Sequence, residues 1–375
     1  MVDFALKTLV HDKVRFAIAV IGVGFAVALV LLQTGLFLGL LDNASVTIAN
    51  ADADIWVTAK NAENVDFATI FPEGRVQRVR STPGIVRADN LIVWFGSVSL
   101  PTGAQEQTLL YALNDFSTWR IPWAIDTGDV EDLRRGPYVF FDGSAEKRLG
   151  EFAVGDYREI FGKRLRIVGR TEGALSFTTS PITFIDFRLM QSLVPESLKG
   201  QTTYILVKLE PGADTAGVMA ELRARLPNND VYTKSAWAAR SRAYWVESTG
   251  IGLNFVLTVF LGALVAVVIV AQTLYSSTME HLREFGVVKA FGGSDALVYR
   301  IIAKQATIAA LAGFALGAIP LLFADRMVES LGLRLLVPQP FYIVVLLATL
   351  ALCLGAGAIS FRRVARLDPI LVFRT

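Results

Sequence analysis

The charged residues with the most suggestive spacing lie in Met279–Asp295, MEHLREFGVVKAFGGSD, a short stretch between two strongly apolar segments. As a helix it carries Glu280, Glu284, Val287 and Phe291 on one side, and Leu282, Phe285 and Lys289 on the opposite side. A helix that lies on lipid needs only one apolar side. The second apolar side therefore predicts a covering protein partner, with a solvated interfacial helix as the alternative. The function expected of this stretch is therefore to dock against another protein.

Residue sets for catalysis or metal binding do not stand out elsewhere. The two histidines, His11 and His281, lack a second metal ligand at a suitable spacing. No paired carboxylates and no Ser/His/Asp set are evident, and Cys353 lies in an apolar window where an inert buried thiol is expected. We therefore expect a chain that is not an enzyme and holds no metal or cofactor of its own.

The composition is that of a membrane protein. The 375 residues are 53% hydrophobic and 19% charged, with a mean hydropathy of +0.48. Four long apolar windows each suffice to cross a bilayer as a helix. The first is too long for a typical signal peptide, so we expect a retained anchor. The predicted transmembrane helices are 16–41, 248–278, 300–324 and 337–361.

Basic residues flank these windows on one side, which the positive-inside rule makes cytoplasmic. They are Lys7, Lys13, Arg15, Arg283, Lys289, Arg300, Lys304, Arg362, Arg363, Arg366 and Arg374. Both termini are then cytoplasmic, and the net charge of +2 gives no reason to expect nucleic acid. The remaining predicted parts are an amphipathic helix at 1–15, an extracytoplasmic domain at 42–247, a cytoplasmic helix at 279–295, a short outer loop at 325–336 and a cytoplasmic tail at 362–375.

The long segment between the first two spans alternates strand-like and helix-like patterns. Seven stretches rich in β-branched and aromatic residues predict strands, and 73–84, 143–150 and 214–227 predict helices, the last with Asp214 as its N-cap. The expected fold is four transmembrane α-helices with a large α+β domain inserted between the first and second. From Ser235 onward the pattern predicts one helix that continues into the second span without a break.

The spans contain no Asp, Glu, Lys, Arg or His, which argues against an ion-coupled transporter. Glycine pairs four residues apart, Gly35 with Gly39 and Gly313 with Gly317, predict close helix packing. Because four helices make a thin bundle, a homodimer is the more useful assembly.

Two motifs carry a family resemblance. Glu280–Ser294 resembles the E-R-x-R-E-(F/I)-G-(V/I)-x-(K/R)-A-(L/I)-G-A-(S/T) signature of MacB/FtsX-type ABC transporter permeases, the type VII superfamily. The tail sequence RLDPI at 366–370 resembles the ending of the same family, and the layout of one span, a large outer domain and three spans covers the whole chain. The N-terminal sequence is most similar to the DevC branch, while His281, Phe291 and Gly293 depart from the signature.

The resemblance implies that the stretch from Met279 is a coupling helix docked in a groove of an ATPase subunit. The residues it assigns to this contact are Glu280, Arg283, Glu284, Phe285, Gly286, Val288, Lys289 and Gly292. A G-x-x-x-x-G-K-[ST] phosphate loop is missing; FGKRL at 161–165 lacks the upstream glycine and the hydroxyl residue. ATP and Mg²⁺ are thus expected on two copies of a separate ATPase.

Two functions follow from this resemblance. The first is export of an amphipathic or lipid-like substrate from the inner membrane or periplasm, by mechanotransmission to the periplasmic domain and with a periplasmic adaptor and outer-membrane channel as further partners. The second is FtsX-like signalling that activates an extracytoplasmic partner without moving cargo. Outer domains of FtsX-like members are usually shorter, which favours export.

Overall fold

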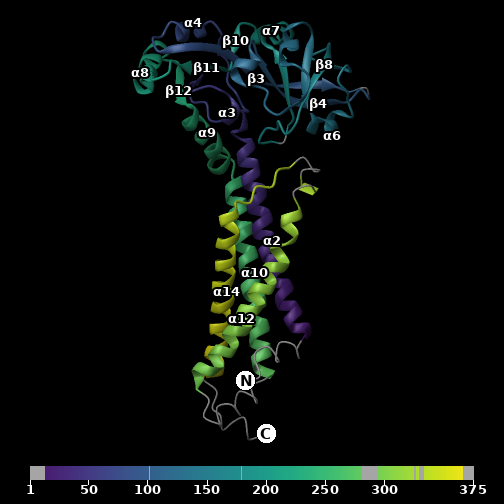
Figure 1. Cartoon of the computed structure of the whole chain (residues 1–375), viewed down its shortest axis with the longest axis vertical. Helices are drawn as coiled ribbons and strands as arrows, with labels where there is room; N and C mark the ends of the chain where they lie inside the picture. The colour runs from purple at the N-terminus through teal and green to yellow at the C-terminus, as the bar shows by residue number, and fades with distance from the viewer. Residues whose placement is uncertain are drawn as a thin grey trace. The chain divides into compact units, whose positions relative to one another are not determined.

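The computed structural model describes residues 13–100, 102–178, 180–280, 294–324, 327–328 and 333–365. The chain divides into two compact units (Figure 1). The first unit comprises 1–39 and 253–375, and the second comprises 40–252. We call them the membrane bundle and the outer domain.

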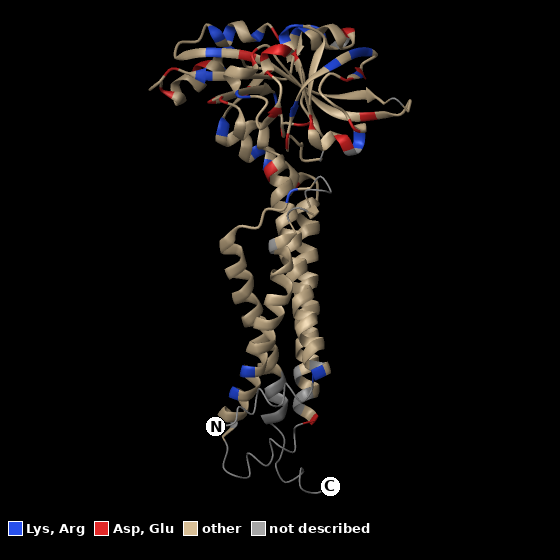
Figure 2. Ribbon diagram, turned by 45° about the vertical axis from the view of Figure 1, so that its right-hand side comes forward, with Lys and Arg blue, Asp and Glu red and all other residues tan. Residues whose placement is uncertain are grey.

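The membrane bundle is built from four helices that are long and apolar enough to cross a membrane. They are α2 (Lys13–Asn43), α10 (Ile251–Glu280), α12 (Asp295–Ala318) and α14 (Gln339–Ala365), and the short 3-10 helix η5 (Pro320–Phe323) follows α12. Figure 2 shows the middle of each long helix free of Lys, Arg, Asp and Glu. The prediction of four spans is confirmed for the described residues.

The third span differs from its predicted bounds of 300–324. The helix begins at Asp295 and ends at Ala318, two residues before Pro320. A proline ring inside an α-helix clashes with the carbonyl four residues earlier, so the α-helix ends here and the chain continues as the 3-10 turn η5. The apolar window alone does not predict where the helix ends, because the apolar residues continue past Pro320.

The outer domain contains one large mixed sheet (Figure 1). Its order is β12-β1-β11-β3-β4-β9-β6-β8-β5, with β7 pairing to β3 and β8. Only β4–β9 and β6–β8 are parallel pairs. The strands are β1 (Ile55–Ala59), β3 (Ile85–Ser99), β4 (Gln105–Leu113), β5 (Ile125–Thr127), β6 (Tyr138–Asp142), β7 (Tyr157–Ile160), β8 (Lys163–Thr171), β9 (Ile182–Asp186), β11 (Tyr204–Leu209) and β12 (Asn229–Thr233); β2 (Phe71–Pro72) and β10 (Gln201–Thr202) form a separate pair.

Both faces of this sheet are buried, because successive residues of a strand point to opposite faces and both sets are apolar. On β1, Trp56 belongs to one core cluster and Ile55 and Val57 to another. On β4, Tyr111 belongs to the first cluster, whereas Leu110 faces a third. The α+β fold predicted for this region is confirmed, and all seven predicted strands are present.

Short helices cover the sheet. The predicted helix at 214–227 is α8 (Thr215–Arg225), and the Asp214 side chain caps it by accepting from Ala216 N at 3.1 Å. The others are α3 (Val46–Asn50), α4 (Arg75–Arg80), α5 (Phe116–Trp119), η1 (Val130–Arg134), η2 (Gly143–Ala145), α6 (Glu146–Leu149), α7 (Phe187–Leu193), η3 (Glu196–Leu198) and α9 (Lys234–Ala243).

The prediction of one unbroken helix from Ser235 into the second span is wrong. Helix α9 ends at Ala243, a π-helical segment η4 spans Tyr244–Ser248, and Gly250 takes a φ of +70° before α10 begins. A left-handed residue cannot continue a right-handed α-helix. The outer domain therefore ends in an irregular segment rather than in a uniform rod.

Candidate functional site

The predicted coupling helix is bracketed by two described helix ends. Helix α10 runs to Glu280, which thereby occupies a helix terminus, and Ser294 takes the N-cap position of α12. The other residues assigned to ATPase contact lie outside the described residues: Arg283, Glu284, Phe285, Gly286, Val288, Lys289 and Gly292. The predicted helix at 1–15, apart from its last three residues, and most of the tail also lie outside them.

Two of the predicted packing glycines bring α12 against α2. A Cβ added at Gly317 would lie 2.3 Å from the backbone oxygen of Gly24, and one added at Gly313 would lie 2.5 Å from Val23. Real carbon atoms do not approach this closely, so only glycine permits this contact. Where lipid removes the hydrophobic drive between helices, such backbone contact is a main source of packing energy.

The other two glycines meet an extended segment rather than a helix. Leu336 N donates to Gly35 O at 3.0 Å, and a Cβ at Gly39 would lie 2.0 Å from the backbone oxygen of Arg334. The residues after the predicted outer loop thus lie against the second half of α2. All four glycines lie at close contacts, but a GxxxG pattern does not indicate which segment each of them contacts.

An apolar cavity of about 220 Å³ lies between α2, α10 and α14. Its lining is almost wholly Val, Ala, Leu and Phe. The hydroxyl of Thr349 donates to Val345 O at 2.7 Å and is thereby satisfied within its own helix. Besides Thr349, the lining contains the thiol of Cys353, which is buried as the sequence led us to expect. An occupant would find no charge here and few polar groups, which suits hydrocarbon and excludes a hydrated ion.

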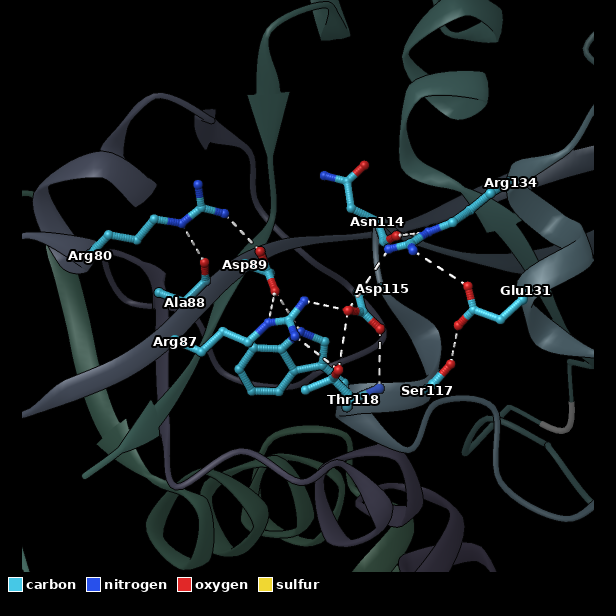
Figure 3. A network of polar contacts seen from close by, with 11 residues as sticks. Arg80, Arg87, Ala88, Asp89, Asn114, Asp115, Ser117, Thr118, Glu131 and Arg134 are labelled. Carbon is cyan, nitrogen blue, oxygen red and sulfur yellow. Dashed lines mark hydrogen bonds and ion pairs between the residues drawn. The ribbon is translucent and has the colours of Figure 1, made fainter. Parts of the chain in front are cut away.

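A network of charged groups joins the elements around β3 of the outer domain (Figure 3). Asp89, only 6% exposed, accepts from Arg80 Nη2 at 2.7 Å, Arg87 Nε at 2.6 Å and Trp119 Nε1 at 2.9 Å. Arg87 also donates to Asp115 at 2.5 Å, and Arg134 lies 3.8 Å from the same carboxylate. Asp89 and Asp115 are each paired with an arginine, and we therefore interpret the network as one that stabilises the fold.

The pKa of Asp115 is set by burial on the one hand and by these hydrogen bonds on the other. Burial acts to raise it, but the Thr118 amide and the Arg87 guanidinium donate to the carboxylate and together lower the pKa below its usual value. This side chain also caps α5 through Thr118 N at 3.1 Å.

A second buried carboxyl, Asp66, is held differently. It is 2% exposed, and its carboxylate accepts a hydrogen bond from the backbone amide of Phe177 at 3.2 Å. The hydroxyls of Tyr111 and Tyr204 lie in the same region: Tyr111 accepts from Thr47 at 3.1 Å, and Tyr204 donates to Val65 O at 3.0 Å. We call Asp66, Tyr111, Phe177, Tyr204 and Trp245 the Asp66 cluster.

Burial raises the pKa of Asp66 to about 7, and the Phe177 amide opposes this only in part. Burial likewise raises the pKa of both tyrosines well above the ordinary value, so they stay neutral. No sequence signal marks Asp66, because an isolated aspartate in NVDFATI has no distinguishing spacing. Its hydrogen-bond donor, Phe177, is far away in the chain.

These features define an integral membrane protein with an inserted extracytoplasmic domain. The MacB-like periplasmic core domain matches residues 16–225, and the FtsX-like permease C-terminal domain matches residues 256–369. The chain therefore belongs to the MacB/FtsX-type ABC transporter permeases, which work with an ATPase partner.

Relatives agree with this membership. The chain is similar to the uncharacterized ABC transporter permease Rv0072 of Mycobacterium tuberculosis, with 25% identity over 375 residues that cover 100% of this chain and 99% of the relative. Mb2592 of Mycobacterium bovis, also an uncharacterized ABC transporter permease, is 25% identical over 382 residues, again 100% of this chain and 99% of the relative.

Solved domains are similar to the outer part. The periplasmic region of MacB from Actinobacillus actinomycetemcomitans has a TM-score of 0.39 and 11% identity over 50% of this chain and 92% of that one. The extracellular domain of YknZ from Gram-positive bacteria has a TM-score of 0.36 and 13% identity over 48% of this chain and 98% of that one.

Proposed function

We propose that this permease moves an amphipathic or lipid-like substrate outward, driven by a separate ATPase in the inner membrane. The observation that supports this most directly is the uncharged cavity between α2, α10 and α14. Hydrocarbon gains free energy by entering such a space, whereas a polar solute would lose its hydration. On this proposal the movement reaches the outer domain through α2 and α10, and both termini are cytoplasmic.

The cavity proposal is tested on the complex purified with its native ATPase. Ala263→Phe fills the cavity from α10, and we expect it to reduce stimulation of ATP hydrolysis by an added phospholipid or single-chain amphiphile at least about tenfold. Leu311→Phe adds a ring at an exposed position of α12, which contributes no residue to the lining, and should change little. Stimulation that survives in Ala263→Phe, or that responds to a polar ion alone, would contradict export of such a substrate and favour signalling.

We further propose that residues 279–293 form the ATPase-docking helix, with Glu280, Arg283 and Glu284 making its polar contacts. The connection begins where α10 ends, at Glu280. Glu284→Arg or Gly286→Val should reduce both the amount of co-purified ATPase and its activity. Unchanged recovery and unchanged activity in both variants would refute the docking role.

A homodimer is the assembly we propose. The membrane window of α10 is only 11% buried within the bundle, compared with 39%, 44% and 28% for α2, α12 and α14. A second copy would cover this helix. In a Cys353→Ala background, Leu257→Cys on α10 should form a disulfide-linked dimer in membranes, whereas Ile359→Cys on α14 should not. Equal cross-linking at the two positions would argue against α10 as the interface. An adaptor and an outer-membrane channel are further proposed partners.

A further inference from the structure

Within the outer domain, the loop that carries Asp66 is fastened to both ends of the domain. Val65 N donates to Ser241 Oγ at 3.3 Å, and Ser241 Oγ donates to Ala44 O at 2.6 Å. Ala44 lies just after α2 ends, and Ser241 lies in the last turn of α9. Residues from the first and last segments of the domain thus meet next to Asp66.

Phe177 contacts both the Asp66 carboxyl group and Trp245 in η4, the segment after α9. Its amide donates to Asp66, and its ring stacks on Trp245 with centroids 3.9 Å apart and an interplanar angle of 12°. Trp245 belongs to η4, and its Nε1 has no hydrogen-bond partner among the described residues. The position of η4 against the loop 174–180 therefore depends on ring contacts, and Asp66 helps to hold the residue that makes them.

The charge on Asp66 has no counterion in the described part of the chain. From β4 and β11 it is faced by the neutral phenols Tyr111 and Tyr204, and from the loop 174–180 by a backbone amide. The α9 arginines are engaged elsewhere: Arg240 donates to Ala62 O at 2.8 Å, and Arg242 donates to Ser45 Oγ at 2.9 Å. An ionised carboxylate at this position must either remain desolvated or admit water.

We propose that Asp66 is a proton-dependent switch: protonated, it keeps the loop 174–180 packed on the π-helical exit segment, and ionised, it releases that contact. The permease would then respond to the pH outside the cytoplasm through the segment that leads into α10. Burial raises the pKa of Asp66 to about 7, so this change falls near neutral pH.

Tryptophan fluorescence can test this proposal, because of where the tryptophans and histidines lie in the chain. Its six tryptophans, at 56, 94, 119, 123, 237 and 245, all lie in the outer domain, and its two histidines lie outside it. A change of tryptophan fluorescence near pH 7 in the purified full chain therefore cannot come from a histidine of that domain. We expect such a change, with a midpoint near neutral pH, and expect Trp245→Phe to remove most of its amplitude.

Asp66→Asn keeps an oxygen for the Phe177 amide but cannot ionise, so it should abolish the transition. Glu247→Gln removes an exposed carboxylate from η4. Glu73→Gln removes a second outer-domain carboxyl whose pKa burial raises. Both variants should leave the midpoint unchanged. The proposal is overturned if the native chain shows no transition, if Asp66→Asn retains it, or if Glu73→Gln removes it.

Hydrogen exchange gives a second measurement that needs no variant. After correction for intrinsic rates, amides in 174–180 and 241–248 of the native chain should exchange at least about threefold faster at pH 8 than at pH 6. The strands β4 and β11 should show no such difference. Equal protection of 174–180 at the two pH values would overturn the proposal even if Asp66→Asn failed to fold.

Discussion

Two of the buried carboxylates of the outer domain, Asp89 and Asp66, show opposite ways of accommodating an acid. Asp89 is 6% exposed and receives two guanidinium groups and an indole N–H, whereas Asp66 is 2% exposed and receives a backbone amide. Pairing with cations keeps a carboxylate ionised, while burial without them favours the proton. The first arrangement joins three donors to one acid, and the second leaves a buried acid whose pKa is raised.

The membrane bundle differs from both, because the middle of its described long helices carries no Asp, Glu, Lys or Arg and α12 approaches α2 by backbone contact. Gly317→Val should therefore have the largest effect of all, since its Cβ would meet the Gly24 oxygen at 2.3 Å and neither backbone can retreat without parting α12 from α2. We expect a loss of at least about 3 kcal/mol and failure to accumulate in membranes.

The matched control is Gly355→Ala on α14, where a Cβ would meet nothing within 4 Å. Thermal unfolding of the detergent-solubilised chain measures both variants. Equal stability of the two would show that the α2–α12 contact does not hold the bundle together.

The next largest effect is the pH dependence of stability that Asp66 causes. The folded pKa of about 7 lies above the ordinary 3.8, so the stabilising contribution of the protonated group is complete below pH 3.8 and is lost as the pH rises to about 7. The outer domain should lose on the order of 3 kcal/mol over this interval. Asp66→Asn should flatten the dependence, as measured by denaturant unfolding followed by tryptophan fluorescence; a dependence of equal slope in that variant would contradict the assignment.

Removal of the paired acid should act in a different way. Asp89→Ala removes the acceptor of Arg80 Nη2, Arg87 Nε and the Trp119 indole, and we expect a loss of about 2 kcal/mol at pH 7. Asp89→Asn, which keeps an acceptor oxygen but no charge, should lose less. If unfolding near neutral pH becomes more pH-dependent in Asp89→Ala, the two carboxylates are not independent.

The smallest effects compare two helix N-caps, Asp214 of α8 and Ser294 of α12. Asp214 accepts a hydrogen bond from Ala216 N, whereas the Ser294 side chain makes no capping hydrogen bond. Asp214→Ala should therefore cost about 1 kcal/mol and Ser294→Ala less than about 0.5 kcal/mol. A larger loss for Ser294→Ala would indicate a contact of this residue outside the described part of the chain.

Much of the fold follows from local patterns. The apolar windows predicted four spans, and the β-branched stretches predicted seven strands, because burial and side-chain alternation act over a few residues. Strands β2, β5, β7 and β12 were missed. They are short, exposed on many positions or polar in composition, and exist because neighbouring strands supply their hydrogen-bond partners.

The sequence by itself determined the membrane class, the inserted domain and the family, since hydropathy and a contiguous charged motif are properties of the chain read in order. Only the tertiary structure decided which backbone Gly35, Gly39, Gly313 and Gly317 approach, where the uncharged cavity lies, and that Asp66 is buried without a cation. Close approach and desolvation depend on segments far apart in the chain, such as 44, 66, 177 and 241, and no local pattern records that they meet.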